Sequence, residues 1–292
     1  MSSTQLLAGI EAGGTKFVLA VGPSPAAITA RYVIPTGQPA QTLAEASAWF
    51  AAQGPIGAIG IASFGPVELD PASPRWGFIT NTPKPGWADC DLAGHFGRSL
   101  GVPAGFDTDV NGAALAEYRL GAGVGSASLA YVTVGTGVGG GLIFDGQLVH
   151  GAAHAEIGHL LPRRPVDDAA FPGICPHHGD CLEGLVCGPA IIARWGQPLS
   201  SLPANHPGHA IIADYLAQLC HTLIAATAVE IIVLGGGVMK TPGLMERVRD
   251  RTAALGNAYF PGTGRHRILP PALADNSGIS GALMLAQLAM RG

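Results

Sequence analysis

The apolar residues of this chain fall in short runs that glycine-rich turns separate. Residues 6–10 and 17–21 are apolar on either side of the glycine-rich stretch 11–16, which predicts a hairpin of two strands. Residues 129–134 begin a second hairpin, in which a glycine-rich turn at 135–141 leads into another strand. Because mixed helical and strand patterns follow each hairpin, the sequence predicts two related α/β lobes with a weak internal duplication.

The remaining pattern predicts helices joined by short strands. Helical composition occurs at residues 42–52, 92–100, 111–120, 189–195, 210–228 and 277–290. Short apolar strands are predicted at residues 56–62, 102–106 and 231–234, and the pair Asp145-Gly146 marks a tight turn within the second hairpin. Residues 68–89 are rich in Pro, Asp and Trp, and a loop of this length in a compact domain is expected to be functional.

Composition argues against several classes of protein. Charged residues make up 12% of the chain, roughly half the usual share, and the net charge is −4. No block of Lys or Arg is present to neutralise phosphates along a duplex, so nucleic acid is not expected as a partner. The first residues lack the regions of a signal peptide, and no apolar run reaches about 18 residues, so we expect no membrane partner. The odd number of cysteines, five, indicates thiols of a cytoplasmic protein.

A compact set of soft metal ligands lies in the middle of the chain. The four are His159, Cys175, His178 and Cys181. The last three are three residues apart from each other, so a tight turn can aim them at one point. Four nitrogen and sulfur ligands close the tetrahedron of Zn²⁺ and leave no position for chemistry, which predicts a structural zinc with catalysis nearby. Glu156 is the nearby candidate, and His154 and His177 are alternative ligands that the spacing disfavours.

Two glycine-rich turns resemble nucleotide-binding loops without matching them. Residues 9–16 have the glycine spacing of a P-loop, but the order is Gly-Thr-Lys and a strand-like run follows. Gly135, Gly137 and Gly140 fit the dinucleotide pattern G-x-G-x-x-G, but again a strand and not a helix follows. A nicotinamide site is therefore not expected.

Both turns instead fit hairpins whose backbone N–H groups bind phosphate. Thr15, Lys16 and Thr136 would add side-chain donors. Simple tight turns, with Lys16 in solvent, are the alternative interpretation. A third glycine turn at residues 235–237, directly after a strand, favours a nucleotide site.

Six motifs occur in the order typical of the ROK family of sugar kinases, which the chain resembles over nearly its whole length. They are Gly-Ile-Glu-Ala-Gly-Gly-Thr-Lys at 9–16, Asp-x-Asn at 109–111, Gly-Thr-Gly-Val-Gly-Gly at 135–140, Glu-x-Gly-His at 156–159, the Cys/His cluster, and Leu-Gly-Gly-Gly at 234–237. The form Cys-Pro-x-His-Gly-Asp-Cys at 175–181, with residues 60–66 and 82–87, resembles the bacterial fructokinase branch of this family.

The resemblance implies a two-lobed, actin-like ATPase (RNase H-like) fold with ATP and sugar in the inter-lobe cleft. Residues 1–108, joined by the C-terminal helix 277–292, would form the N-terminal lobe, and residues 109–276 the C-terminal lobe. The implied cofactors are ATP, Mg²⁺ and a structural Zn²⁺. The implied reaction transfers the γ-phosphoryl group to a hexose, with fructose giving fructose 6-phosphate, and the implied assembly is a homodimer. Glucose, mannose and N-acetylhexosamines are the alternative substrates.

The resemblance also assigns a catalytic base. Asp109 would accept the proton of the sugar hydroxyl. The competing interpretation makes Asp109 the N-cap of the helix that follows, as Asp often is. Asp107 is the rival carboxylate, disfavoured because only Asp109 has an Asn two residues further on.

Further site residues follow from the same resemblance. The sugar contacts would be Glu156, His159, Asn81 and Glu183, although Glu183 could also cap the following helix. The ATP contacts would be Gly13, Gly14, Thr15, Lys16, Gly135, Thr136, Gly137, Pro189, Gly235, Gly236 and Gly237. Glu11 would contact Mg²⁺. Trp76 and Trp87 could close over the sugar together with Asn81, or could be packed surface.

The chain departs from the family pattern at three places. Glu11 stands where many members have Asp, and Thr108 stands where many have Asn before the catalytic Asp. His178 replaces one of the three cysteines that many members use for zinc.

Two other classes of protein compete with an enzyme. Some ROK proteins are repressors with a DNA-binding domain before the sugar domain, but the first hairpin here begins at Leu6 and the net charge is negative. A sugar-responsive protein without catalysis would lack the base or the phosphate turns, and both motifs are present.

Overall fold

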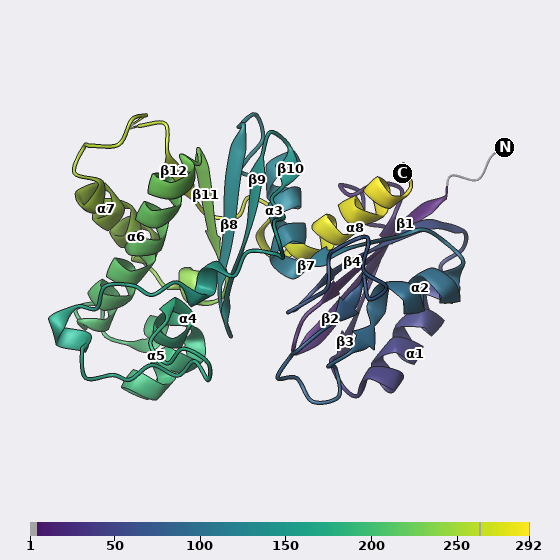
Figure 1. Cartoon of the computed structure of the whole chain (residues 1–292), viewed down its shortest axis with the longest axis horizontal. Helices are drawn as coiled ribbons and strands as arrows, with labels where there is room; N and C mark the ends of the chain where they lie inside the picture. The colour runs from purple at the N-terminus through teal and green to yellow at the C-terminus, as the bar shows by residue number, and fades with distance from the viewer. Residues whose placement is uncertain (1–4, 263, 292) are drawn as a thin grey trace. The chain divides into compact units, whose positions relative to one another are not determined.

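The computed structural model describes residues 5–262 and 264–291, and these divide into two compact units (Figure 1). Unit 1 takes the described part of Met1–Gly121, Leu148–His154 and Leu273–Gly292, and unit 2 takes Ala122–Gln147 and Ala155–Ala272. The chain therefore enters unit 1 a second time at residues 148–154, between two stretches of unit 2.

The unit boundary differs from the predicted one after residue 108, because α3 (Asp109–Leu120) belongs to unit 1. This helix packs closely on α8 (Ser277–Ala289): a Cβ atom on Gly281 would lie 2.0 Å from the carbonyl oxygen of Gly112. The buried carboxylate of Glu117 also accepts hydrogen bonds from Leu273 N (3.0 Å) and Ser277 Oγ (2.7 Å). These contacts attach α3 to the C-terminal segment.

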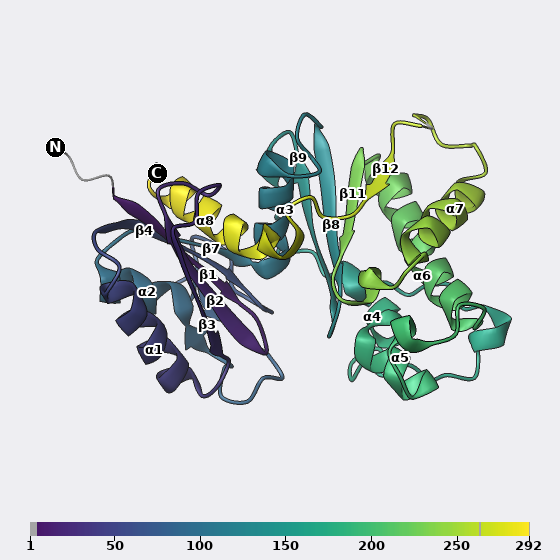
Figure 2. The ribbon, with the colours of Figure 1, turned by 180° about the vertical axis from the view of Figure 1, so that it is seen from behind.

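Unit 1 is built on a five-stranded sheet in the order β3-β2-β1-β4-β7. Its strands are β1 (Leu6–Ala12), β2 (Lys16–Gly22), β3 (Ala30–Pro35), β4 (Ile56–Ser63) and β7 (Ala104–Thr108). Strand β2 is antiparallel to both of its neighbours, β1 and β3, and β1, β4 and β7 are parallel. Figure 1 and Figure 2 show α1 (Pro39–Ala51) and α2 (Leu92–Leu100) on one face of the sheet and α8 on the other.

Unit 2 repeats this topology with a second sheet in the order β10-β9-β8-β11-β12. Its strands are β8 (Ser128–Val134), β9 (Val138–Phe144), β10 (Gln147–Leu148), β11 (Ile231–Gly235) and β12 (Arg267–Leu269). Again a hairpin, here β8 and β9, is extended by two parallel strands. The helices are α4 (Leu182–Val186), α5 (Gly188–Trp195), α6 (Gly208–Thr227) and α7 (Leu244–Gly256). The matching strand order agrees with the predicted internal duplication.

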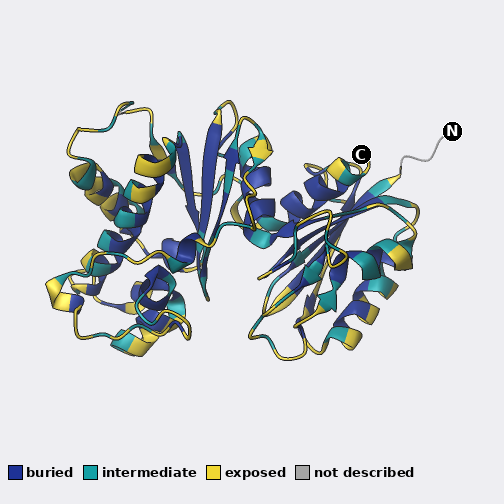
Figure 3. Ribbon diagram, viewed as in Figure 1, coloured by how far each residue is buried: buried dark blue, intermediate teal, exposed yellow. Residues whose placement is uncertain are grey.

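Each unit has its own apolar core, visible as dark blue strands and inward helix faces in Figure 3. In unit 1, Phe17, Phe50 and Phe96 are fully buried. In unit 2, the core includes Tyr215 and Leu216 of α6. That helix is long and apolar enough to cross a membrane by length and composition, but half of its most apolar window is buried within the protein.

The structure corrects several predicted elements. The second glycine turn covers only residues 135–137, because β9 already begins at Val138, and the glycines at 139–141 lie within the strand. Strands β3 and β12 and helices α4 and α7 were not predicted. The long loop contains two short paired strands, β5 (Phe78–Ile79) and β6 (Cys90–Asp91), at its end.

Candidate active site and metal centre

The first glycine turn, between β1 and β2, and Asp109 lie at the same edge of the unit 1 sheet. The parallel strands β1, β4 and β7 are in register, so that Ala12 pairs with Ser63 and Ser63 with Thr108. The turn begins one residue after Ala12, and Asp109 follows Thr108 directly. Two strand spacings, roughly 10 Å, therefore separate the points where the turn and the α3 helix leave the sheet.

Thr108, and not Asp109, is the N-cap of α3. The Thr108 hydroxyl accepts a hydrogen bond from Asn111 N (3.1 Å), and Asp109 is the first helical residue. Asp109 is partly exposed, and its Oδ1 accepts from Val110 N at 2.9 Å. The competing interpretation of Asp109 as the cap is thus wrong, because the threonine before it already caps the helix.

The neighbouring carboxylate Asp107 is buried, with 3% of its surface exposed. Its Oδ1 accepts from Thr108 N (2.8 Å) and from the side-chain amide of Asn111 (2.6 Å). The Asn of the Asp-x-Asn motif therefore bonds Asp107 and holds it away from solvent. This leaves Asp109 as the accessible carboxylate of the pair.

Hydrogen bonds fix the turn between β1 and β2, and its tip is exposed. Gly13 N donates to Lys16 O (3.0 Å), and the hydroxyl of Thr36 donates to Gly13 O (2.7 Å). Gly14, Thr15 and Lys16 are exposed. Exposed backbone at a fixed tight turn is the arrangement that binds phosphate oxygens.

The turn between β8 and β9 is braced by two helices of unit 2. Glu183 of α4 accepts a hydrogen bond from Val138 N (2.9 Å), and Gly188 N at the start of α5 donates to Gly135 O (2.7 Å). Thr136 at the tip is exposed. Pro189, in the first turn of α5, is also exposed and follows the residue that holds the turn.

The third glycine turn lies directly beside the second. Strand β11 pairs with β8 in parallel, so that Gly235 is opposite Thr133. Gly236 has φ +90°, and a Cβ atom there would lie 2.4 Å from Val134 O. Only glycine fits this position, because both the backbone angle and the close approach exclude a side chain. The predicted nucleotide residues of unit 2 thus form one continuous edge.

The four predicted zinc ligands converge. Their donor atoms all lie within 4.8 Å of one another. His159 Nδ1 is 3.4 Å from Cys181 Sγ and 3.8 Å from Cys175 Sγ, which is 3.7 Å from His178 Nδ1. Ligand atoms of tetrahedral zinc lie roughly 3.4 to 3.8 Å apart, given bonds of about 2.1 Å to nitrogen and 2.3 Å to sulfur. The four residues therefore fit Zn²⁺, and the alternatives His154 and His177 are outside the set.

Ionisation of the cluster follows from its surroundings. Burial, with a smaller effect of Cys175, raises the pKa of the Cys181 thiol to about 11 when no cation is bound. A cation has to displace that proton, because thiolate is the form that binds a metal.

Glu156 lies on the opposite side of the His159 ring from the cysteines. Its Oε2 is 3.9 Å from His159 Nε2, beyond hydrogen-bond distance. The Glu156 side chain is half exposed. One nitrogen of His159 therefore faces the metal cluster and the other faces this accessible carboxylate.

Glu11 lies near the end of β1, two residues before the first glycine turn. It lies against the first turn of α8, where a Cβ atom on Gly278 would be 2.5 Å from its carboxyl carbon. Burial raises the pKa of Glu11, while Lys16 and Arg31 oppose the shift. Its carboxylate is thus partly removed from water, which disfavours the charged form.

The two tryptophans of the long loop differ in their surroundings. Trp87 is fully buried, packs against Phe17 and Phe64, and donates its ring N–H to Gly37 O (3.0 Å). Trp76 packs on Phe106 with ring centroids 6.1 Å apart. The predicted lid role of Trp87 is therefore wrong, because its ring belongs to the unit 1 core. Asn81 is exposed on the same loop.

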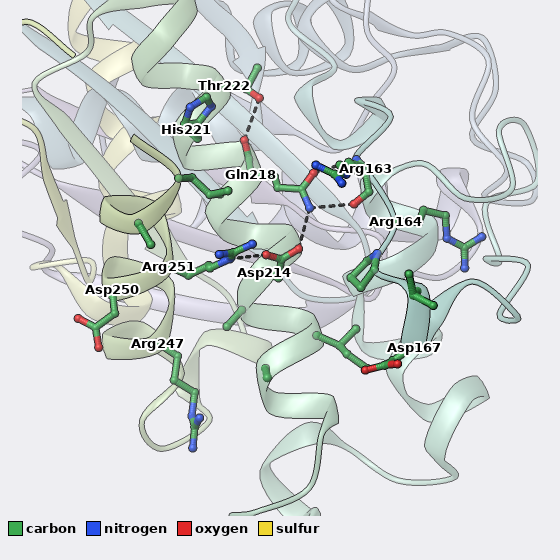
Figure 4. Close-up of a pocket in the computed structure, with 17 residues that line it drawn as sticks. Arg163, Arg164, Asp167, Asp214, Gln218, His221, Thr222, Arg247, Asp250 and Arg251 are labelled. Carbon is green, nitrogen blue, oxygen red and sulfur yellow. Dashed lines mark hydrogen bonds and ion pairs between the residues drawn. The ribbon is translucent and has the colours of Figure 1, made fainter. Parts of the chain in front are cut away.

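A cavity of about 980 Å³ opens elsewhere in unit 2, between α6, α7 and the segment at residues 163–167 (Figure 4). Its walls are tied by hydrogen bonds of Gln218 to Asp214 and Arg163, and by the Asp214–Arg251 ion pair at 2.5 Å. None of the predicted site residues lines it.

The comparison with known proteins decides the family. A model described as the ROK family matches residues 7–289. The chain belongs to the ROK family.

Individual relatives agree with this membership. A fructokinase from Zymomonas mobilis subsp. mobilis (strain ATCC 31821 / ZM4 / CP4) is 47% identical, with 95% of each chain covered. A fructokinase from Pediococcus pentosaceus is 43% identical, with 98% of this chain and 99% of the relative covered. A crystal structure of a ROK hexokinase from Thermus thermophilus has a TM-score of 0.79 at 26% identity, covering 98% and 99% of the two chains.

The predicted residues of this ROK protein divide between the two units. Glu11, Gly13, Gly14, Thr15, Lys16, Asn81 and Asp109 lie in unit 1, and the remaining predicted sugar, nucleotide and zinc residues lie in unit 2. Within unit 1, the sheet register brings the turn and Asp109 to one edge. Within unit 2, the Cys/His cluster leads directly into α4, whose Glu183 holds the second turn.

Sequence reasoning missed two residues that hold parts of the candidate site in place, Thr36 and His150. Thr36 secures the first turn through both its hydroxyl and its backbone N–H, which donates to Thr15 O at 2.9 Å. His150 contacts Asp107 across a separation of 43 residues, at 2.9 Å. Neither lies within a recognisable motif, so only their position in space reveals them.

Proposed function

We propose that this ROK protein is an ATP-dependent sugar kinase that converts fructose to fructose 6-phosphate. Two fructokinases at 47% and 43% identity over nearly full length support fructose as the acceptor. Glucose, mannose and N-acetylhexosamines remain the alternative acceptors, because the side chains described here bind sugar hydroxyls in general.

The observation that carries a catalytic role is the partial exposure of Asp109 at the start of α3, at the same sheet edge as the first glycine turn. Thr108 caps α3, Asn111 bonds Asp107, and Asp109 stays partly exposed beside the turn that would hold phosphate. As the sugar oxygen bonds to the γ-phosphorus, Asp109 accepts the hydroxyl proton and the bond to the ADP oxygen breaks. The products are sugar phosphate and ADP.

The remaining residues bind and orient the two substrates. Glu156, His159, Asn81 and Glu183 are proposed to contact the sugar, since carboxylates are strong acceptors for hydroxyl donors. In this proposal Glu183 also holds the second phosphate turn through Val138 N. The glycine turns at residues 13–16, 135–137 and 235–237, with Pro189, contact ATP. Mg²⁺ would neutralise phosphate charge, and the partly desolvated Glu11 is its proposed protein contact.

Zn²⁺ is proposed to have a structural role. His159, Cys175, His178 and Cys181 would hold it with no open position, so it supplies folding energy and no reacting group. It would fix the segment between the half-exposed Glu156 and α4. The segment then forms a wall of the sugar site.

We also propose a cytoplasmic homodimer. In the described part of the chain none of the five cysteines forms a disulfide, which suits a reducing compartment. In the proposed dimer, a second copy of the chain would cover exposed apolar side chains such as Leu161 and Val166, which are 74% and 91% exposed. Light scattering of the purified protein would measure its mass in solution, and a monomer at micromolar concentration would rule out the dimer.

The test of substrate identity is a panel of hexoses. ADP release would be measured with Mg·ATP and fructose, glucose, mannose, N-acetylmannosamine or N-acetylglucosamine. Fructose is expected to give the highest kcat/KM. A higher value for another hexose would reassign the substrate, and no turnover of any sugar would reject the kinase.

A further inference from the structure

The carboxylate of Asp107 has a donor on each side. Its Oδ1 accepts from Thr108 N and from the Asn111 amide, and its Oδ2 accepts from His150 Nε2 at 2.9 Å. Only 5% of the Asp107 side chain is exposed. A buried carboxylate is stable when hydrogen bonds of this kind replace its water, so His150 completes the set.

His150 reaches Asp107 because the chain returns to unit 1 at Leu148–His154. A second histidine fixes the other end of this short segment: His154 Nε2 accepts from Val67 N at 3.3 Å. The segment is thus attached to unit 1 at two points, next to the strand ends that carry Asp107. Residues far apart in sequence are therefore in contact here: His150 with Asp107, and His154 with Val67.

The hydrogen bonds define which nitrogen of His150 carries a proton. Nε2 lies 2.9 Å from a carboxylate oxygen, so it is the donor. The Asn111 amide nitrogen is 3.4 Å from the same Nε2, and two donors do not bond each other. Protonation therefore occurs at Nδ1, and the ring is 39% exposed for that exchange.

We propose that His150 is a positioning residue for phosphoryl transfer, acting through Asp107 on Asn111 and the first turn of α3, and thereby on Asp109. This inference rests on the proposed role of Asp109 as the base. Asp109 immediately follows Thr108 and precedes Asn111 by two residues, so both of its flanks are fixed by bonds that involve Asp107 or the Thr108 cap. Loss of the His150 donor leaves Asp107 Oδ2 buried without that hydrogen bond. The carboxylate can then rotate, and the Asn111 amide, which is bound to its Oδ1, moves with it.

The positive charge of a protonated His150 ring would also support this positioning role. Asp107 places a negative charge two residues from the proposed base, and His150 can offset that charge when its ring is protonated. The hydrogen bond to Asp107, opposed by burial, raises the pKa of His150. Within the described residues, the charged group next to the His150 ring is Asp107, and the neutral Asn111 amide also lies next to this ring. The charge is retained to higher pH than in a free histidine and is lost as pH rises further.

Two substitutions of His150 distinguish the effect of its hydrogen bond to Asp107 from the effect of its charge. In His150→Gln the amide nitrogen can take the place of Nε2 and donate to Asp107 without a charge, whereas in His150→Asn the shorter side chain cannot reach. His95→Gln is the matched control, because His95 lies in α2 of the same unit and bonds Ser47 instead, at 3.1 Å.

The measurement is kcat and KM for fructose and ATP from pH 5.5 to 9, with circular dichroism to verify folding. We expect His150→Asn to lower kcat about tenfold to hundredfold, as a small misplacement of a reacting group does, with KM for ATP within about twofold of wild type. His150→Gln should recover most of kcat near neutral pH and lose the pH step that the His150 charge contributes. His95→Gln should match wild type.

Equal kcat for folded His150→Asn, His150→Gln and wild type would overturn the positioning role. Equal losses in both His150 variants, with no recovery by Gln, would also contradict it, because reach to Asp107 would then be irrelevant. Failure of the wild-type enzyme to phosphorylate any hexose would instead reject the proposed function itself. The two failures are therefore distinguishable.

Discussion

The side-chain amide of Asn111 donates to Asp107 at 2.6 Å, across one turn at the start of α3. As a result, two carboxylates that are two residues apart lie in different environments. Asp107 is buried and satisfied, and Asp109 between these partners remains partly exposed. In the proposed mechanism, the environment of the two carboxylates, and not their residue type, determines which one accepts the proton.

The capping role of Thr108 predicts a stability effect. Thr108→Ala removes the oxygen that accepts from Asn111 N and should lower the free energy of unfolding by about 1 kcal/mol. Thr108→Ser keeps the oxygen and should lose much less. Chemical denaturation measures both, and equal losses in the two variants would contradict the cap.

The zinc ligands predict different outcomes for two adjacent histidines. His178→Ala should lower zinc affinity at least about tenfold, because it opens the closed ligand set, whereas His177→Ala should retain one zinc per chain. Metal analysis after dialysis against a chelator measures this difference. Equal zinc content in the two variants would reject the assignment.

Zinc removal should also weaken nucleotide binding. Cys181 is the N-cap residue of α4, and Glu183 in that helix accepts from Val138 N at the second phosphate turn. Loosening the cluster therefore loosens the turn, and we expect ADP affinity by calorimetry to fall about tenfold in the zinc-free protein. Unchanged ADP affinity in folded, zinc-free protein would show that the turn does not depend on the cluster.

Burial of Glu11 predicts a dependence of stability on pH. Because its folded pKa is raised, the folded state binds this proton more tightly, so Glu11 favours folding at acidic pH and loses that contribution as pH rises through the folded pKa. At pH 7 to 8 the charged carboxylate is a cost. Glu11→Gln should therefore raise the free energy of unfolding there, with a gain that shrinks on acidification.

The same Glu11 variant tests the proposed Mg²⁺ contact. An amide binds Mg²⁺ more weakly than a carboxylate, so Glu11→Gln should raise the Mg²⁺ concentration needed for half-maximal rate. If Glu11→Gln raises the free energy of unfolding but leaves the half-maximal Mg²⁺ concentration unchanged, the proposed Mg²⁺ contact of Glu11 is wrong.

The sequence predicted those parts of the fold that local pattern determines. The two glycine-turn hairpins, α2 and the buried strands have strong apolar runs between glycines, and the structure places them close to the predicted residues. Helix α7 was missed because its residues are largely polar and its buried positions are few: Leu244, Val248 and Thr252. The edge strand β3 was missed for a similar reason, since most of its residues are exposed.

The candidate site was predictable where ligands are close in sequence. The three-residue spacing of Cys175, His178 and Cys181 predicts that they are metal ligands, and the structure brings their donor atoms together. Contacts that depend on tertiary packing were not accessible in this way. Trp87 looked like a loop residue available for a lid, yet it packs in the core, and no sequence signal links His150 to Asp107.

The most direct test of the account is the rate of ADP release, with fructose and Mg·ATP, in wild type and Asp109→Asn. Asp145→Asn, a change of the same chemistry in the exposed turn after β9, is the control. We predict that Asp109→Asn remains folded, since Thr108 caps the helix, and loses about 10² to 10⁴ in kcat, as expected for loss of a general base. A folded Asp109→Asn enzyme with the activity of wild type and of Asp145→Asn would contradict the central claim.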